Sequence, residues 1–138
     1  MDDPGPKHCG RCLCGAVRFE ASGAPLWVAH CHCESCRRQT GSAMATFVGL
    51  AKDGFTYVAG APATYHSSPG VTRSFCRGCG TPLTYEAERY PNEVHVYVCT
   101  LDHPEAYPPK GHVHVGEQLP WLHVADELPR YQTTSRET

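Results

Sequence analysis

The sequence predicts a mostly β domain of short, mainly antiparallel strands with one short helix. The chain of 138 residues contains 13 Gly and 12 Pro, which indicates many turns and argues against long helices or a coiled coil. Between these turn residues, short segments alternate apolar and polar side chains, as half-buried strands do. The length is typical of a single domain.

The first half of the chain is expected to contain three strands and the helix, followed by a fourth strand. In the segment Ala16–Ala21, Val17 and Phe19 share one face and charged side chains share the other, which is the alternation of a half-buried strand. The helix over Glu34–Gln39 ends at Thr40-Gly41, because glycine readily adopts the left-handed conformation that terminates a helix. The further strands expected here are Leu26–His30, Ala43–Leu50 and Phe55–Val58.

The second half is expected to contain strands alone. The segment Glu93–Cys99 carries the clearest pattern, because valines occupy positions 94, 96 and 98 while His95 and Tyr97 face the other way. The further strands expected here are Val71–Phe75, Leu83–Glu86, His112–Val115 and Trp121–Val124.

The ends of the chain are expected to be flexible, over residues 1–7 and 132–138, which leaves residues 8–131 as a single domain. The first seven residues, MDDPGPK, are acidic and contain no apolar stretch, so they do not resemble a secretory signal. No segment approaches the roughly 18 apolar residues that a membrane span needs. We therefore expect a cytoplasmic protein that does not bind membranes.

The charge argues against a nucleic-acid partner. Twelve Lys and Arg stand against 14 Asp and Glu, for a net charge of -2, and no basic tract of five residues is present. The nine cysteines are an odd number, and in the cytoplasm cysteines serve more often as metal ligands or catalytic groups than in disulfides.

One pair of cysteines has the spacing of a metal site. Cys76 and Cys79, with Gly78 and Gly80, can chelate one ion from a tight turn. The other two ligands must come from the N-terminal cluster, either as Cys9 with Cys12 or as Cys12 with Cys14. Four thiolates complete a tetrahedral zinc site and leave no place for substrate, so this site would be structural. A rubredoxin-like iron site is the main alternative.

The middle cluster contains three cysteines, Cys31, Cys33 and Cys36, without a fourth at ligand spacing. Cys36 lies in the turn that begins the predicted helix, where backbone N–H groups favour thiolates. Three protein ligands and one open position are typical of a catalytic zinc site, where water or an external thiol takes the fourth place.

An imidazole is the alternative fourth ligand of this cluster. His30, His32, His112 and His114 are the candidates, and such a closed site would be structural. His32 alternates with the thiols and is expected to point away from them, in a supporting or surface position. The motif His112-x-His114 is interpreted as two surface histidines on a half-buried strand.

The other residues noted in the sequence are interpreted as having no role in catalysis or metal binding. Cys99 is expected to be a small buried hydrophobe and Cys9 a spare thiol near the N-terminus. Trp121 is expected to anchor the core. Arg37 and Arg38 are interpreted as solvated charges beside a negative site.

Taken in order, the three cysteine motifs resemble the family named for the glutathione-dependent formaldehyde-activating enzyme and centromere protein V. The resemblance extends from about Cys9 to Tyr131 and includes the C-terminal pattern around Pro120-Trp121-Leu122. The motifs that carry it are Gly10-x-Cys12-x-Cys14-Gly15-Ala16-Val17-x-Phe19, Cys31-His32-Cys33-x2-Cys36-Arg37-x3-Gly41-Ser42 and Phe75-Cys76-x2-Cys79-Gly80-Thr81-x-Leu83.

This resemblance implies a β-tent fold of coiled antiparallel sheets that is stapled by zinc. It implies two zinc ions. The first is a structural ion on Cys12, Cys14, Cys76 and Cys79, which selects the Cys12 and Cys14 pair. The second lies on Cys31, Cys33 and Cys36 with its fourth position open to glutathione or water. The exposed sheet edges of a β-tent also allow a homodimer.

The function that we expect is that of a zinc-dependent carbon–sulfur lyase. The family's name-giving enzyme joins glutathione and formaldehyde into S-(hydroxymethyl)glutathione. We therefore expect this chain to bind a small thiol such as glutathione and to join it to, or release it from, a small aldehyde. No catalytic acid or base is assigned, and His30, His32 and Asp102 are the candidates considered. The alternative function is a non-catalytic zinc-binding module, either a thiol carrier or a protein-interaction domain.

Overall fold

The computed structural model describes residues 5–134, and its fold is the mostly β fold with one short helix that the sequence predicts. Ten strands and one α-helix lie in this part of the chain. They are β1 (Lys7–Arg11), β2 (Arg18–Ser22), β3 (Trp27–Cys31), α1 (Glu34–Thr40), β4 (Ala45–Ala51), β5 (Phe55–Ala59), β6 (Ala63–Ser68), β7 (Val71–Phe75), β8 (Pro82–Ala87), β9 (Glu93–Tyr97) and β10 (His112–Val113). The helix is too short to cross a membrane, and none of the described residues forms a longer one.

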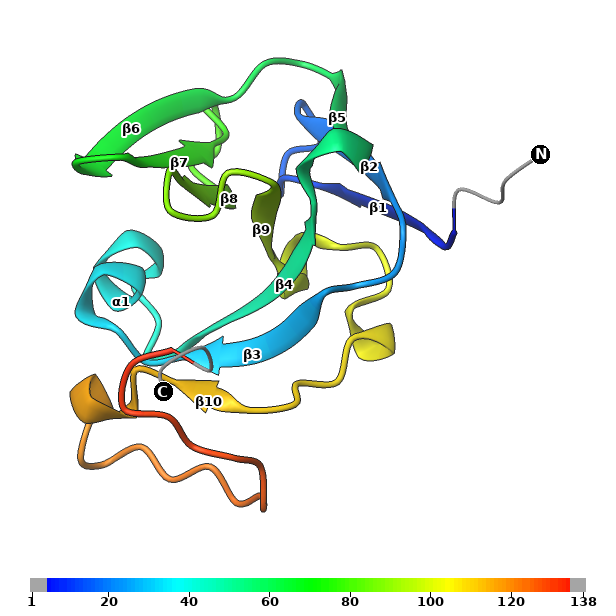
Figure 1. Ribbon diagram of the computed structural model, residues 1–138. Helices are drawn as coiled ribbons and strands as arrows, with labels where there is room; N and C mark the ends of the chain where they lie inside the picture. Colours follow the sequence, from blue (N-terminus) through cyan, green and yellow to red (C-terminus); the bar gives the residue numbers. More distant parts are fainter. Residues whose placement is uncertain (1–4, 135–138) are drawn as a thin grey trace.

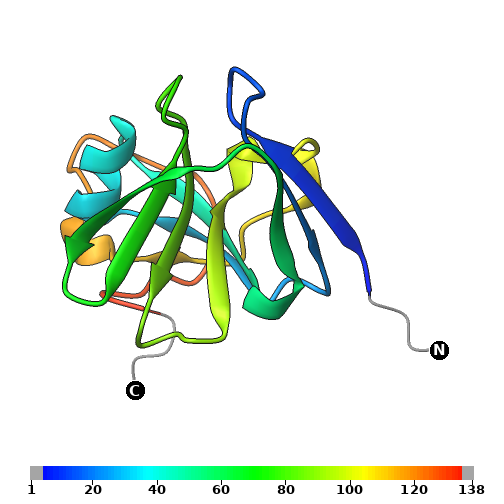
Figure 2. The same ribbon diagram turned by 90° about the horizontal axis from the view of Figure 1, so that it is seen from above.

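The strands form two sheets. Three strands pair in the order β1-β2-β5, and seven pair in the order β10-β3-β4-β9-β8-β7-β6. Every pair of strands is antiparallel except β10 and β3, which run parallel. Figure 1 shows the seven-stranded sheet strongly bent, with β6–β8 above, β3 and β10 below, and α1 at the side between them. Figure 2 shows the small sheet at the end of the molecule away from α1.

The central strands β4 and β9 are buried on both faces. On one face, Val48 and Leu50 of β4 join Val94 and Val96 of β9 in the main core, together with Phe19 from the small sheet. Each fully buried side chain of this size contributes ~1.5–3 kcal/mol to the free energy of unfolding. The opposite face carries a second cluster, which contains Phe47 and Tyr97 together with Cys31 and Cys36, and Cys33 packs against it. The two faces of these strands therefore belong to two separate clusters of buried side chains.

Two observed strands have no counterpart among the predicted ones. Strand β1 buries only His8 and Gly10, and neither side chain gives an apolar signal. Strand β6 forms the edge of the large sheet and is almost entirely exposed, so it carries no alternation.

The prediction of a strand at Trp121–Val124 is wrong. Its side chains do not enter the core, and Trp121 is 67% exposed. The strand predicted at Glu93–Cys99 ends early, at Tyr97, because the chain turns into a short 3-10 helix at Val98–Thr100. This turn exposes Cys99, which was expected to be buried.

The predicted flexible ends lie mostly outside the described residues, since residues 1–4 and 135–138 are not described. Of the rest, Lys7 begins β1, and the backbone carbonyl of Thr133 accepts a hydrogen bond from the backbone N–H of His114.

Candidate metal centres and pocket

The structure brings Cys12, Cys14, Cys76 and Cys79 together at one end of the molecule. One sulfur atom from each lies within 4.8 Å of all the others. The Cys12 and Cys14 sulfurs are 3.6 Å apart, and those of Cys14 and Cys76 are 3.8 Å apart. A tetrahedral site with zinc–sulfur bonds of about 2.3 Å separates its sulfurs by about 3.8 Å, so this cluster fits zinc.

Two tight loops present these four thiols. In the first loop, the Val17 N–H points at the Cys12 sulfur at 3.3 Å; in the second, the Cys79 N–H points at the Cys76 sulfur at 3.4 Å. The second loop closes with Gly80 at a φ of 81°, a conformation that favours glycine. Hydrogen bonding with Thr81 lowers the pKa of Cys79 to about 5, which favours the thiolate that a metal requires. Cys9 is exposed and lies outside the cluster.

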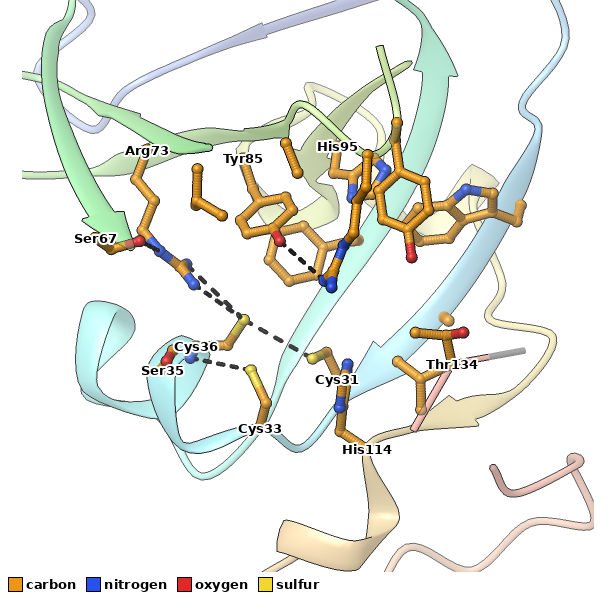
Figure 3. A pocket seen from close by; sticks show the side chains of 18 of the residues that line it. Cys31, Cys33, Ser35, Cys36, Ser67, Arg73, Tyr85, His95, His114 and Thr134 are labelled. Carbon is orange, nitrogen blue, oxygen red and sulfur yellow. Dashed lines mark hydrogen bonds between the residues drawn. The ribbon is translucent and has the colours of Figure 1, made fainter. Parts of the chain in front are cut away.

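The structure also brings Cys31, Cys33 and Cys36 together, in the wall of a pocket (Figure 3). Cys31 ends β3, and Cys33 caps α1 by accepting a hydrogen bond from the Cys36 N–H at 3.3 Å. The Cys31 and Cys36 sulfurs are 3.8 Å apart, again the separation that zinc requires. Hydrogen bonds from the Cys31 and Cys36 thiols lower the pKa of Cys33 to about 2, and the same contact raises the pKa of Cys31. These contacts favour a thiolate at Cys33, the ionised form that a metal ligand needs.

A buried arginine stands beside these sulfurs. Arg73 of β7 is only 4% exposed, and its guanidinium nitrogens lie 3.9 and 4.0 Å from the Cys36 sulfur. It also donates to the Tyr97 hydroxyl at 3.3 Å and to the Ser67 hydroxyl at 3.0 Å, and it stacks over the ring of Tyr85. Because these contacts fix the guanidinium, Arg73 compensates the charge of the thiolates without moving.

The pocket has a volume of about 720 Å³ and an aromatic wall opposite the cysteines. His95 lies at the centre of this wall. Its ring stacks on Tyr85, meets the edge of Trp27 and contacts Tyr90. The Glu93 carboxylate is 3.0 Å from the His95 ring nitrogen and accepts a hydrogen bond from the Trp27 indole at 3.1 Å. Ring contacts and hydrogen bonds therefore connect the side chains of this wall, and Figure 3 shows His95 next to Tyr85 in it.

Charged groups of both signs surround the pocket. Arg89 and Lys110 line it as cations besides Arg73, and Glu88 and Glu117 line it as anions. Arg89 donates to the Tyr85 hydroxyl at 3.4 Å and stacks on Tyr90, so its guanidinium lies against the aromatic wall. The pocket can therefore recognise carboxylate and ammonium groups on one small molecule.

Among the four histidines considered as a fourth ligand, His114 alone lines the pocket. Figure 3 shows it on the side of the pocket that holds the cysteines, but it is not within the 4.8 Å group of the three sulfurs. The interpretation of His112 as a surface residue is wrong. His112 and His32 are both fully buried, and their ring nitrogens are 2.9 Å apart. His32 thus turns away from the thiols, as the alternation along the chain predicts.

The other residues considered from the sequence lie outside the pocket. Arg37 donates to the backbone carbonyls of His32 and Glu117, and Arg38 forms an exposed ion pair with Glu34. Asp102 is exposed, and its N–H pairs with the carbonyl of Cys9. None of the acid or base candidates considered, His30, His32 and Asp102, is among the lining residues.

Sequence reasoning missed Arg73 and the aromatic wall. Arg73 lies 37 positions from Cys36, and no local motif links the two. The sequence offers one indication of its role, which is an arginine in the middle of a short strand. That position is buried because β7 pairs with β6 on one side and with β8 on the other.

A scan of family models matches residues 7–117 to the model described as "Glutathione-dependent formaldehyde-activating enzyme". All seven cysteines of the two clusters lie in this range.

Two curated proteins are similar. A protein of Halomonas elongata named "Putative glutathione-dependent formaldehyde-activating enzyme" is 32% identical over 126 residues, which cover 83% of this chain and 79% of that protein. An uncharacterized lyase of Schizosaccharomyces pombe is 32% identical over 80 residues, 58% of each chain. The crystal structure of a Rhodobacter sphaeroides protein has the same fold, with a TM-score of 0.58 and 24% identity over 88% of this chain and 98% of that one.

Proposed function

Because this chain belongs to the glutathione-dependent formaldehyde-activating enzyme family, we propose that it is a zinc-dependent carbon–sulfur lyase acting on glutathione or a similar small thiol. The observation that carries the proposal is the position of three clustered thiols and a buried arginine in the wall of a pocket large enough for a tripeptide. The names of the relatives, a formaldehyde-activating enzyme and a lyase, agree with this class.

We propose that two zinc ions bind. Cys12, Cys14, Cys76 and Cys79 would hold a structural ion, and Cys31, Cys33 and Cys36 would hold the second. When bound in the pocket, zinc lowers the pKa of a coordinated thiol and keeps it as the nucleophilic thiolate. Arg73 supplies the remaining charge compensation from within the protein, since it is fixed by Tyr97 and Ser67.

The chain's other charged residues fit a thiol that carries carboxylates and an ammonium group. Lys110 and Arg89 are the cations available to the carboxylates, because Arg73 is already committed to the thiolates. Glu88 and Glu117 are the anions available to the ammonium group. Holding both ends of the molecule would direct its sulfur toward the cysteine cluster and exclude thiols without these charges.

In the synthetic direction, the substrate thiol loses its proton to water and its sulfur bonds to the aldehyde carbon. The electron pair of the carbonyl bond moves to oxygen, which takes a proton from water. In the lyase direction the same carbon–sulfur bond breaks and releases the thiol and the aldehyde. The aromatic wall around His95 limits water on one side of the reacting groups.

We propose a cytoplasmic location, which the two cysteine clusters support, because thiolate ligands escape oxidation in a reducing compartment.

The test compares Cys33→Ser with Cys99→Ser in zinc-loaded protein. Serine can still cap α1 but cannot supply a thiolate, so the first variant removes one ligand while keeping the local fold. Cys99 is exposed and lies outside both clusters, which makes it the matched control. Calorimetry measures glutathione binding, and exchange NMR measures the rate at which S-(hydroxymethyl)glutathione forms from glutathione and formaldehyde.

We expect the wild type and Cys99→Ser to hold two zinc ions and to accelerate the exchange. Cys33→Ser is expected to hold one ion and to lose at least about 100-fold in rate. A wild-type protein that holds two zinc ions but does not bind glutathione would contradict the proposal and favour a non-catalytic zinc-binding module.

A further inference from the structure

A row of polar side chains crosses the large sheet on the face opposite the cysteine pocket. His112 of β10 is the register partner of His30 of β3, and His30 is the register partner of Thr46 of β4. The His30 and His112 rings lie 4.9 Å apart. Because side chains alternate along a strand, Cys31 faces the pocket while His30 faces this row.

The C-terminal segment closes this row with a carboxylate. The segment runs beside β10, held by backbone hydrogen bonds from His112 to Pro129 and from Tyr131 to His112. It places a carboxylate oxygen of Asp126 2.8 Å from the Nε2 atom of His112. One ligand atom from each of His30, His112 and Asp126 lies within 4.8 Å of the other two.

Each of these three side chains is oriented by a second partner. The Nδ1 atom of His30 lies 2.7 Å from the Thr46 hydroxyl, and the Nδ1 atom of His112 lies 2.9 Å from the ring of His32. The second carboxylate oxygen of Asp126 accepts the N–H of Leu128 at 3.0 Å. Such outer partners fix the ring orientation and the tautomer of metal-ligating residues.

We propose that His30, His112 and Asp126 form a third metal site, which binds a divalent transition metal such as Zn²⁺ through two imidazoles and one carboxylate. This ligand set is typical of borderline metals, and three protein ligands leave positions for water. His112 is fully buried, while the side chain of Asp126 is 23% exposed, so the site opens to solvent on the side of the C-terminal segment.

Binding replaces the hydrogen bond between His112 Nε2 and Asp126, because both atoms become metal ligands. His112 then carries its single ring proton on Nδ1, as a neutral metal-ligating imidazole does, and donates it to the Nε2 atom of His32. The site contains no sulfur and does not depend on the proposed lyase reaction.

Cobalt titration of protein that carries two zinc ions per chain, after dialysis has removed more weakly bound zinc, tests the proposal. Co²⁺ in a nitrogen and oxygen site gives weak visible d–d absorption without the near-ultraviolet charge-transfer band of thiolate ligation. We expect one saturable equivalent of Co²⁺ with this signature beyond the two thiolate-bound zinc ions, and we expect Zn²⁺ to compete for it.

Two ligand variants and one control sharpen the test. His30→Gln and Asp126→Asn should each weaken this Co²⁺ binding at least tenfold, and Asp126→Asn should keep the fold because Asp126 lies at the surface. The control is His103→Gln, which alters an exposed histidine–carboxylate pair with Glu105 and should leave the titration unchanged.

The proposal is overturned if the wild type shows no saturable third equivalent. It is equally overturned if Asp126→Asn and His30→Gln, with their zinc content and melting temperature intact, titrate like the wild type. Either result would identify the cluster as a hydrogen-bonded structural network.

Discussion

The two cysteine clusters use the same ligand chemistry in different surroundings. Four thiols from two loops complete the site at one end of the molecule, and none of them lines the large pocket. Three thiols at the junction of β3 and α1 do line it, beside the buried guanidinium of Arg73. In the proposed roles, a structural site and a reactive one differ in the number of thiols and in the neighbouring charge rather than in ligand type.

The largest expected effect is on stability, from Cys76→Ser. Cys76 is 2% exposed and shares the cluster that joins the N-terminal loop to the loop after β7. Binding of a structural zinc supplies about 10–16 kcal/mol, so this variant should fail to fold cooperatively. Circular dichroism during heating measures this, with Cys9→Ser, an exposed thiol of the same region, as the control. A melting temperature close to that of the wild type would remove the structural role.

The second expected effect is at Cys33, where the loss should be large in activity and small in stability. Cys33→Ser should lower the melting temperature by about 10 °C or less, equivalent to ~2 kcal/mol, because serine preserves the helix cap and the main core lies elsewhere. The loss of activity is expected to be far larger than the loss of stability. If Cys33→Ser unfolds like Cys76→Ser, both clusters are structural and the contrast between them fails.

The third effect isolates the charge beside the pocket cluster. Arg73→Met keeps an unbranched stem but removes the cation next to Cys36, and we expect a loss of about tenfold to 100-fold in rate. Arg38→Met is the matched control, because Arg38 forms only an exposed pair with Glu34. Steady-state exchange rates measure both. Equal rates for the two variants would show that Arg73 serves packing alone.

The smallest effect compares two glycines, one in each region. A Cβ on Gly49 would lie 2.3 Å from the Trp27 indole, and one on Gly10 would lie 2.3 Å from the Phe19 ring. Each alanine variant should cost about 1–3 kcal/mol in the free energy of unfolding. Gly49→Ala should also weaken glutathione binding, because Trp27 lines the pocket, whereas Gly10→Ala should not. Urea unfolding and calorimetry separate the two outcomes, and equal thiol affinities would contradict the assignment of the aromatic wall.

The elements that could be predicted from the sequence are those with one buried face. Strand β7 has the predicted bounds, and the valines of β9 enter the main core as expected. Strand β1 could not be predicted, because its buried positions are His8 and Gly10, which form no apolar pattern. Position 10 requires glycine, since a Cβ there would collide with the ring of Phe19. Strand β6 is an exposed edge held by pairing alone.

The candidate sites could also be predicted only in part from the sequence. Cysteine spacing indicates both clusters, and the family resemblance selects Cys14 over Cys9, which agrees with the observed grouping. The spacing carries no information about Arg73 or about the network of His95, Glu93 and Trp27, because these contacts join strands far apart in the sequence. Trp121 was predicted to be buried and is exposed. An apolar residue after a proline does not by itself indicate whether other elements cover its side chain.

Chelator titration of the wild-type protein tests the division between the two clusters most directly. Zinc release, the exchange rate and the far-ultraviolet circular dichroism signal are followed together. The account predicts that one ion leaves first from the open pocket site and takes the activity with it while the β signal persists, and that the second ion leaves only as the sheet signal is lost. Release of both ions in one step, or activity that survives the first release, would contradict it.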